Sequence, residues 1–197
     1  IFGGVGTKYK HVINTINIYK KMNITPYFIE APGILSSTLF RPKKYEAFSN
    51  KFVNVIEKDQ QPFILHSISG ANWLVYNIHK KIKAEGIVLE SGPIWPTLTT
   101  LHKYLNITYK LDISYQLLEW FMNILNIPTD KQYWYNEELN VKPTVNTLIL
   151  IGDNDTLINK EDINNAYINP YNNPNTNNKI FKFEEAGHCN IFKKSPY

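Results

Sequence analysis

The strongest constraint on the fold of this chain is a regular alternation of short apolar runs with longer amphipathic stretches. The short runs are rich in β-branched residues, and several are almost continuously apolar, as in strands covered on both faces. We expect strands at Ile1-Phe2, Pro26–Glu30, Pro62–Ser67, Gly86–Glu90, Val145–Ile151 and Lys179–Glu184. Apolar residues at three- and four-residue spacing predict helices at Tyr9–Met22, Lys44–Lys58 and Gly70–Lys83. The alternation predicts an α/β fold with a mostly parallel sheet flanked by helices.

The alternation breaks after Gly92. Residues 93–142 carry several helical patterns, no convincing strand and many aromatic side chains. A connection of this length is uncommon unless it has a function of its own. With 197 residues, the chain has a length typical of one domain. We therefore expect 1–197 to form a single domain in which 93–142 is a helical cap insertion.

The two ends of the sequence read as internal positions. The first residues carry neither an initiator methionine nor a signal-like charged start, and they resemble the end of a strand. We expect N-terminal strands of the sheet to precede Ile1, and further residues to follow Tyr197.

Charge and cysteine content narrow the partners and the compartment. The formal net charge is +4, and the lysines are scattered among acidic residues, a pattern that argues against a nucleic-acid partner. Cys189 is the single cysteine, so it has no internal disulfide partner and no metal-ligand spacing. A reducing, intracellular compartment is expected, either cytoplasmic or at the periphery of a membrane. No apolar run reaches the roughly 18 residues that a membrane-spanning helix needs.

Ser69 stands at a sharp transition from strand to helix. The predicted strand Pro62–Ser67 runs directly into Ser69-Gly70 and then into a helical pattern. This is the context of a nucleophile elbow, in which the residues two before and two after the serine must be small. Ser67 and Ala71 meet that requirement. The hydroxyl then projects at a helix N-terminus, where free amides favour negative charge.

Backbone amides near Ser69 are expected to form an oxyanion hole. The N–H of Gly70 would be one donor. The second must come from another loop, and the glycine-rich segment that follows the first predicted strand is flexible enough to supply it from Gly4 or Val5. A simple tight turn is the competing interpretation of these glycines.

A serine nucleophile needs a base and a group that orients the base. Of five histidines, His188 lies in a turn just beyond the last predicted strand, where it can reach the carboxyl edge of the sheet. The strand Val145–Ile151 ends in a loop with two carboxylates, of which Asp155 is the preferred acid. Asp153 and Glu90 remain alternatives, and a helix cap or turn is the competing role for the loop carboxylates.

The order Ser69, Asp155, His188 along the chain is that of the α/β hydrolases. Over essentially its whole length, the chain resembles this superfamily and, more narrowly, the transmembrane protein 53-like family. The matching motifs are Gly3-Gly4-Val5-Gly6-Thr7, Lys10-His11, Tyr19, His66–Ala71, Glu90-Ser91-Gly92-Pro93, Asp155, Glu161-Asp162, His188 and Pro196-Tyr197. Gly4 replaces a tryptophan and Glu90 an aspartate of the family pattern. The resemblance implies a hydrolase fold with the triad above.

The site predicts a serine hydrolase that cleaves a carboxylic ester or thioester, with Trp95, Trp120 and Trp134 of the insertion walling an apolar acyl pocket. For any one of these aromatics, packing onto the core is the competing interpretation. The sequence shows no phosphate-cradling or dinucleotide motif and no clustered His or Cys ligands, so neither a cofactor nor a metal is expected. The alternative function is an inactive hydrolase-fold scaffold that acts as a binding or membrane-surface module.

Overall fold

The computed structural model describes residues 1–4, 7–30, 42–59, 61–92, 97–125, 145–158, 160–164 and 177–194. At its centre lies a parallel sheet of four strands in the order β1-β2-β3-β4. The strands are β1 (Ile64–Ile68), β2 (Gly86–Glu90), β3 (Thr147–Gly152) and β4 (Lys179–Phe183). Each lies where the sequence predicts a strand. Because the pairing is parallel, all four carboxyl ends meet at one edge of the sheet.

Two further segments extend the sheet beside β1. Phe2 forms parallel bridges with both Ser67 and Ile29. These are isolated bridges, so the two strands expected at Ile1-Phe2 and Pro26–Glu30 are shorter than predicted. Pro26 has no N–H to donate to a ladder, which limits pairing there. The spatial order is therefore Ile29, Phe2, then β1 to β4.

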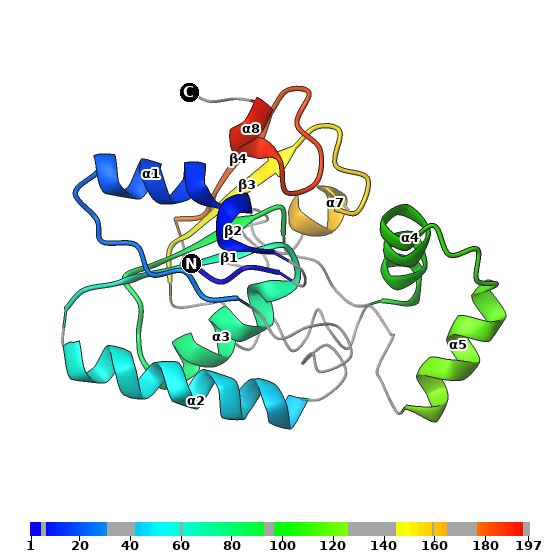
Figure 1. The fold of residues 1–197 in the computed structure, drawn as a ribbon, viewed down its shortest axis with the longest axis horizontal. Helices are drawn as coiled ribbons and strands as arrows, with labels where there is room; N and C mark the ends of the chain where they lie inside the picture. The colour runs from blue at the N-terminus through cyan, green and yellow to red at the C-terminus, as the bar shows by residue number, and fades with distance from the viewer. Residues whose placement is uncertain are drawn as a thin grey trace.

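Helices cover both faces of the sheet (Figure 1). On one face lie α2 (Pro42–Asp59) and α3 (Asn72–Lys81), and on the other lie α1 (Ile13–Lys21) and the short α8 (Ile191–Lys194). The predicted helix Tyr9–Met22 is interrupted at Val12, because a 3₁₀ turn, η1 (Tyr9–His11), precedes α1. Likewise, a second 3₁₀ turn, η3 (Ser69–Ala71), precedes α3.

The core follows from the two-residue period of the strands. Leu89 and Ile149 point to the α3 face, where they pack with Val75, and all three are fully buried. Their chain neighbours Val88 and Leu150 point to the opposite face and belong to a cluster that includes residues of α8. Both faces of the central strands are thus apolar and covered, which explains their nearly continuous apolar sequences.

Two helices occupy the described part of 93–142. They are α4 (Leu98–Tyr109) and α5 (Tyr115–Ile124). Each begins at a hydroxyl cap, since the side chains of Thr97 and Ser114 accept hydrogen bonds from the backbone N–H groups of Thr100 and Leu117. Figure 1 shows the pair beside the sheet, and the two helices enclose a small apolar cluster of their own, formed by Leu98, Leu101, Leu118 and Met122.

In the parts of the chain that the structure describes, no helix combines the length and the hydropathy needed to cross a bilayer.

Candidate functional site

The order of the strands creates a topological switch point at the carboxyl edge of the sheet. From Phe2 the chain passes through α1 to Ile29 on one side, whereas from β1 it passes through α3 to β2 on the other side. The two connecting helices therefore lie on opposite faces of the sheet, and the change of face falls between Phe2 and β1. Ligands of open α/β sheets bind at such a switch point, outside the carboxyl ends of the strands. Gly4 and Ser69 are the residues that follow these two strands.

Ser69 occupies the turn between β1 and α3. Its φ is 57°, in the left-handed region, where a non-glycine residue costs about 1–3 kcal/mol. Ser67 and Ala71, two residues to either side, are buried. The small side chains at these positions therefore fit the sharp turn, and the turn aims the serine hydroxyl out of the sheet edge at the start of a helix.

Gly4 lies directly against this turn. A Cβ atom at Gly4 would stand 2.9 Å from the carbonyl oxygen of Ile68 and 2.9 Å from the Cβ of Ser69. Real Cβ atoms do not approach backbone this closely, so only glycine fits. The glycine thus lets the backbone after the first strand reach the turn at Ser69. Val5, the other predicted donor, lies outside the described residues.

His188 reaches Ser69 from the opposite end of the four-stranded sheet. It follows β4, and its Nε2 lies 2.9 Å from the Oγ of Ser69. The other ring nitrogen, Nδ1, lies 2.8 Å from Oδ2 of Asp155. An ionised carboxylate only accepts hydrogen bonds, so Nδ1 carries a hydrogen, and in the neutral ring Nε2 accepts the hydroxyl hydrogen of Ser69.

Asp155 is held by hydrogen bonds at both of its oxygens. Oδ2 accepts from His188, while Oδ1 accepts from the backbone N–H groups of Leu157 at 2.9 Å and Ile158 at 3.3 Å. The Asp155 side chain is 0% exposed, whereas that of His188 is 21% exposed. The carboxylate is therefore fixed in orientation, and the His188 side chain keeps some contact with solvent.

Opposing effects act on the pKa of His188. Burial of the ring lowers the pKa, because desolvation disfavours the charged form. The hydrogen bond to Asp155 raises it, and Cys189 raises it further, so that the net pKa lies well above the ordinary value of 6.5. The hydrogen bond with Asp155 thus favours the imidazolium form of His188. This is the form that the ring would take on accepting a proton from Ser69.

The two alternative acids lie elsewhere. Asp153 is exposed and forms an ion pair with Lys160, with Nζ 3.1 Å from Oδ1. The Glu90 side chain is buried, with Oε2 3.2 Å from Nε2 of His66. Of the three carboxylates considered from the sequence, Asp155 is the one that the structure brings to His188.

Glu90 belongs to a buried polar network with His66 and Tyr19. Nδ1 of His66 lies 2.9 Å from the Tyr19 hydroxyl, so the network joins β1, the end of β2 and helix α1. Burial lowers the pKa of His66, with a partly compensating effect of Glu90, and burial together with the Glu90 charge raises the pKa of Tyr19. His66 therefore points toward the flanking helix α1.

The three remaining histidines lie on other elements. His11 is exposed on η1, His79 is buried on α3, and His102 of α4 is hydrogen-bonded through Nε2 to the carbonyl of Ile113.

Comparison with known proteins identifies the fold. No protein-family model matches the chain, and no curated protein matches its sequence. An esterase from Pyrococcus furiosus matches in structure with a TM-score of 0.64 at 17% identity, over 99% of this chain and 76% of the esterase chain. An α/β-hydrolase enzyme from a sediment metagenome of the Mar Chica lagoon, Morocco, gives a TM-score of 0.61 at 14% identity, over 97% of this chain and 81% of the other. A hydrolase from Oleispira antarctica gives 0.56 at 14% identity, over 98% and 84%.

These matches agree with the parallel sheet and its two helical layers. The chain has the α/β-hydrolase fold. The fold class predicted from the sequence is thereby confirmed. In α/β hydrolases the nucleophile, acid and histidine follow one another in that order along the chain, at the carboxyl edge of the sheet. Ser69, Asp155 and His188 have that order and that location.

Of the three tryptophans predicted to line a pocket, one lies within the described part of this α/β-hydrolase fold. Trp95 and Trp134 lie outside the described residues, and Trp120 is 60% exposed on α5. Tyr104 of α4 packs edge-to-face against Tyr109 of the same helix, with ring centroids 5.8 Å apart. Burial and the neighbouring Tyr109 raise the pKa of Tyr104.

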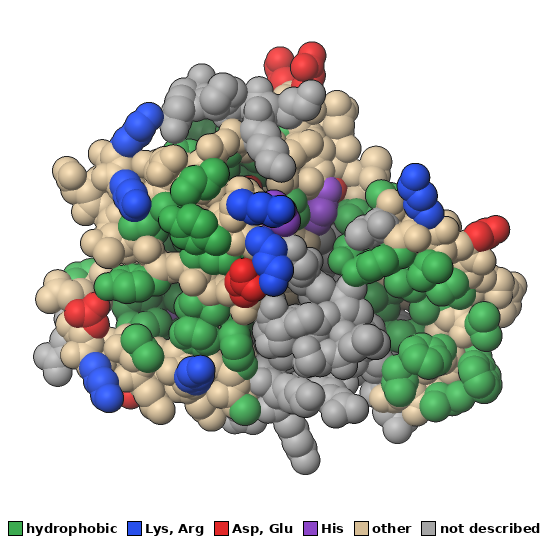
Figure 2. Space-filling view, in the orientation of Figure 1, with side chains coloured by type: hydrophobic (Ala, Val, Ile, Leu, Met, Phe, Trp, Pro, Cys, Tyr) green, Lys and Arg blue, Asp and Glu red, His purple; other side chains and the backbone are tan. Residues whose placement is uncertain are grey.

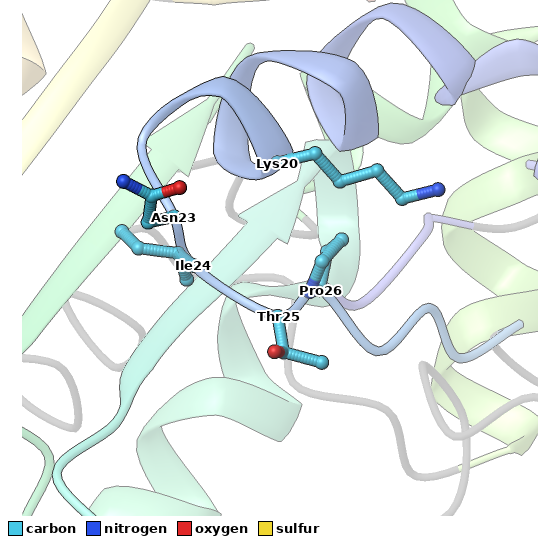
Figure 3. A pocket seen from close by; sticks show the side chains of 5 residues that line it. All are labelled: Lys20, Asn23, Ile24, Thr25 and Pro26. Carbon is cyan, nitrogen blue, oxygen red and sulfur yellow. The ribbon is translucent and has the colours of Figure 1, made fainter.

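A hollow on the opposite side of the fold is lined by none of the residues of the Ser69 site. It has a volume of about 310 Å³ and is lined by Lys20, Asn23, Ile24, Thr25 and Pro26 (Figure 3). Helix α1 leads away from the carboxyl edge of the sheet, so this hollow at its far end is remote from Ser69. Within the described ranges, no group of three or more His, Cys, Asp or Glu side chains is arranged to hold a metal ion.

Proposed function

We propose that this chain is a serine hydrolase that cleaves a carboxylic ester or thioester through an acyl-enzyme intermediate. The observation that carries the proposal is the continuous hydrogen-bonded row Ser69–His188–Asp155, which starts at a strained serine between a strand and a helix. Strain persists at a site only when the surrounding structure enforces it, and it is concentrated at functional sites.

In the proposed mechanism, His188 Nε2 takes the hydroxyl proton of Ser69 while Oγ attacks the carbonyl carbon of the substrate. The N–H of Gly70, with that of Gly4 or Val5, binds the oxyanion. Each such donor contributes about 3–4 kcal/mol in the transition state. His188 then protonates the leaving oxygen or sulfur, which departs and leaves an ester on Ser69.

The second half of the cycle repeats these roles with water. His188 takes a proton from a water molecule, whose oxygen attacks the acyl carbon, and it returns the proton to Ser69 Oγ as the carboxylic acid leaves. Asp155 stays ionised throughout and stabilises the imidazolium form of His188. No cofactor takes part in these steps.

The aromatic insertion supports an apolar acyl group as substrate. In this proposal, residues 93–142 form a helical cap, and Trp95 and Trp134 contribute to its acyl pocket. Trp120, which the sequence also assigned to the pocket, lies instead on the exposed face of α5. The motifs His66–Ala71 and Glu90-Ser91-Gly92-Pro93 further support placement in the transmembrane protein 53-like branch of the hydrolases, from whose pattern Gly4 and Glu90 depart.

A fluorophosphonate probe tests the proposed function. The wild-type chain is expected to gain the mass of one phosphonyl group at Ser69, because an assembled site phosphonylates its nucleophile. Ser69→Ala is expected to remain unlabelled. Ser49→Ala, which removes another fully buried serine hydroxyl, on α2, is the matched control and should label like wild type. A folded wild-type chain that resists the probe, or one labelled at a residue other than Ser69, contradicts the proposal.

One observation favours the alternative of a binding module without activity. Helix α5 exposes an apolar face whose four members recur at helical spacing and are each at least half exposed: Leu117, Trp120, Phe121 and Ile124. Figure 2 shows hydrophobic side chains gathered over α4 and α5. Exposed apolar faces of this kind mark interaction surfaces. The probe separates the two functions, because an inactive scaffold leaves Ser69 unmodified.

Substitution of Gly4 tests the oxyanion site. Gly4→Ala is expected to lower kcat for p-nitrophenyl butyrate by about a hundredfold, the usual effect of losing one oxyanion donor, because the new Cβ must displace the backbone at Ile68 or Ser69. Gly86→Ala is the control, since its Cβ would meet only the carbonyl oxygen of Asn146, at 3.7 Å. Equal kcat for Gly4→Ala and wild type excludes a role for this close approach.

A further inference from the structure

The loop that carries His188 must cross most of the sheet to reach Ser69. His188 follows β4, while Ser69 follows β1, three strand positions away in the order β1-β2-β3-β4. At roughly 4.8 Å per strand, the span is about 14 Å. A loop of this reach holds a side chain in place only if it is anchored along the way.

The first anchor lies at β3. The N–H of Asn154 donates to the carbonyl of Ala186 at 2.9 Å. Gly152, the last residue of β3, touches the same peptide, because a Cβ there would lie only 2.1 Å from the Ala186 oxygen. Closer to the histidine, Oδ1 of Asn190 accepts from the N–H of Gly187 at 2.7 Å. These contacts fix the loop up to the residue before His188.

The second anchor lies at β2, nearer to Ser69. Ser91 directly follows β2, and its Oγ accepts a hydrogen bond from the backbone N–H of Cys189 at 2.8 Å. Ser91 is 0% exposed, and its own N–H donates to the carbonyl of Leu150 at 2.8 Å, so its backbone is fixed to the sheet. Its φ is 50°, in the left-handed region that glycine adopts without strain. Serine occupies this position although glycine would adopt the same conformation without strain.

We propose that Ser91 is a positioning residue, whose hydroxyl fixes the loop so that the imidazole of His188 faces Ser69. This inference rests on the proposed hydrolase function. The hydroxyl holds the peptide on the far side of His188, whereas Asn190 holds the near side and Asp155 holds the ring. Without Ser91, the Cys189 N–H loses its acceptor and the loop keeps no other described hydrogen bond to β2. A misplacement of about 1 Å lowers turnover by about a hundredfold.

Two variants separate the hydroxyl from the backbone conformation. Ser91→Gly removes the hydroxyl but suits a φ of 50° better than serine does. Ser91→Ala removes the hydroxyl and keeps a Cβ. If the hydroxyl positions His188, both variants lower kcat for p-nitrophenyl butyrate by about 10- to 100-fold, with KM changed by less than about threefold. If Ser91 serves only to form the turn, Ser91→Gly turns over at least as fast as wild type, and the proposal is overturned.

Hydrogen exchange gives a readout that does not depend on activity. The Cys189 amide is expected to exchange at least tenfold faster in Ser91→Gly than in wild type, with unchanged exchange of the β2 and β3 amides. Ser49→Ala, the buried-serine control, should leave both kcat and the Cys189 amide unchanged. If the Cys189 amide exchanges at the same rate in Ser91→Gly as in wild type, the proposed anchor is wrong, even when the enzyme is active. A wild-type chain without esterase activity refutes the proposed function, and the exchange of the Cys189 amide still decides whether the anchor exists.

Discussion

His188→Ala is expected to lower kcat for p-nitrophenyl butyrate by about four to six orders of magnitude. The loss is this large because the Ser69 hydroxyl is a poor nucleophile at neutral pH and His188 is the described base within hydrogen-bonding distance of its Oγ. The chain should still fold, since Asp155 keeps the two backbone hydrogen bonds from Leu157 and Ile158 that satisfy its buried Oδ1.

The control for this substitution is His11→Ala, which removes an exposed histidine on η1 and should change kcat by less than about twofold. Thermal unfolding measured on both variants separates loss of chemistry from loss of structure. Turnover by a folded His188→Ala chain at more than about a tenth of the wild-type rate would refute the general-base role.

Asp155→Asn is expected to lower kcat by about four orders of magnitude. An amide in place of the carboxylate can present its NH₂ group to Nδ1, which favours the tautomer whose Nε2 carries the hydrogen and cannot accept the Ser69 proton. The substitution also removes the negative charge that stabilises the imidazolium form of His188.

The same substitution shifts the pH dependence of the residual activity. Only the neutral imidazole acts as base, so kcat rises with pH through the pKa of His188. Since the Asp155 pair raises that pKa, the acid limb of the wild-type profile lies above the 6.5 of an ordinary histidine. Removing the carboxylate removes this effect, and the acid limb of Asp155→Asn is expected to move to lower pH. The kcat profile of each enzyme, recorded upward from about pH 5, the lower end of the range in which proteins tend to be most stable, measures the shift.

Asp153→Asn and Glu90→Gln are the matched controls. Asp153 stands two residues from Asp155 but pairs with Lys160 in solvent, so its neutralisation should change kcat by less than about threefold. Glu90 faces His66 inside the fold, so Glu90→Gln should lower the free energy of unfolding without moving the acid limb. A loss of four orders of magnitude in either control, with Asp155→Asn unaffected, would assign the acid to that residue.

The sequence predicts the elements of this fold well where a local pattern determines them. The strands β2 and β3 are recognisable because two-sided burial makes them nearly continuously apolar, whereas β4 is largely exposed. The elbow at Ser69 is recognisable because small residues flank a serine between strand and helix. Prediction is poorer where pairing is marginal. At Phe2 and around Ile29 the strands reduce to single bridges, because pairing depends on neighbours that a local pattern does not specify.

The sequence also leaves open which carboxylate meets His188. Asp153 and Asp155 occupy the same short loop, and their local sequences are equally compatible with an acid. The tertiary structure distinguishes them: the N–H groups of Leu157 and Ile158 turn Asp155 inward, while Lys160 draws Asp153 toward solvent. Helical spacing likewise does not show that the face of α5 containing Trp120 is exposed.

The sequence alone therefore determined the α/β class, the sharp turn at Ser69 and the order along the chain of Ser69, Asp155 and His188, because hydrophobic periodicity and turn chemistry act over a few neighbouring residues. Only the tertiary structure decided which side chains meet. His188 is 119 residues from Ser69, and the hydrogen bonds that bring its loop across β3 and β2 join segments whose separation along the chain leaves no local signal.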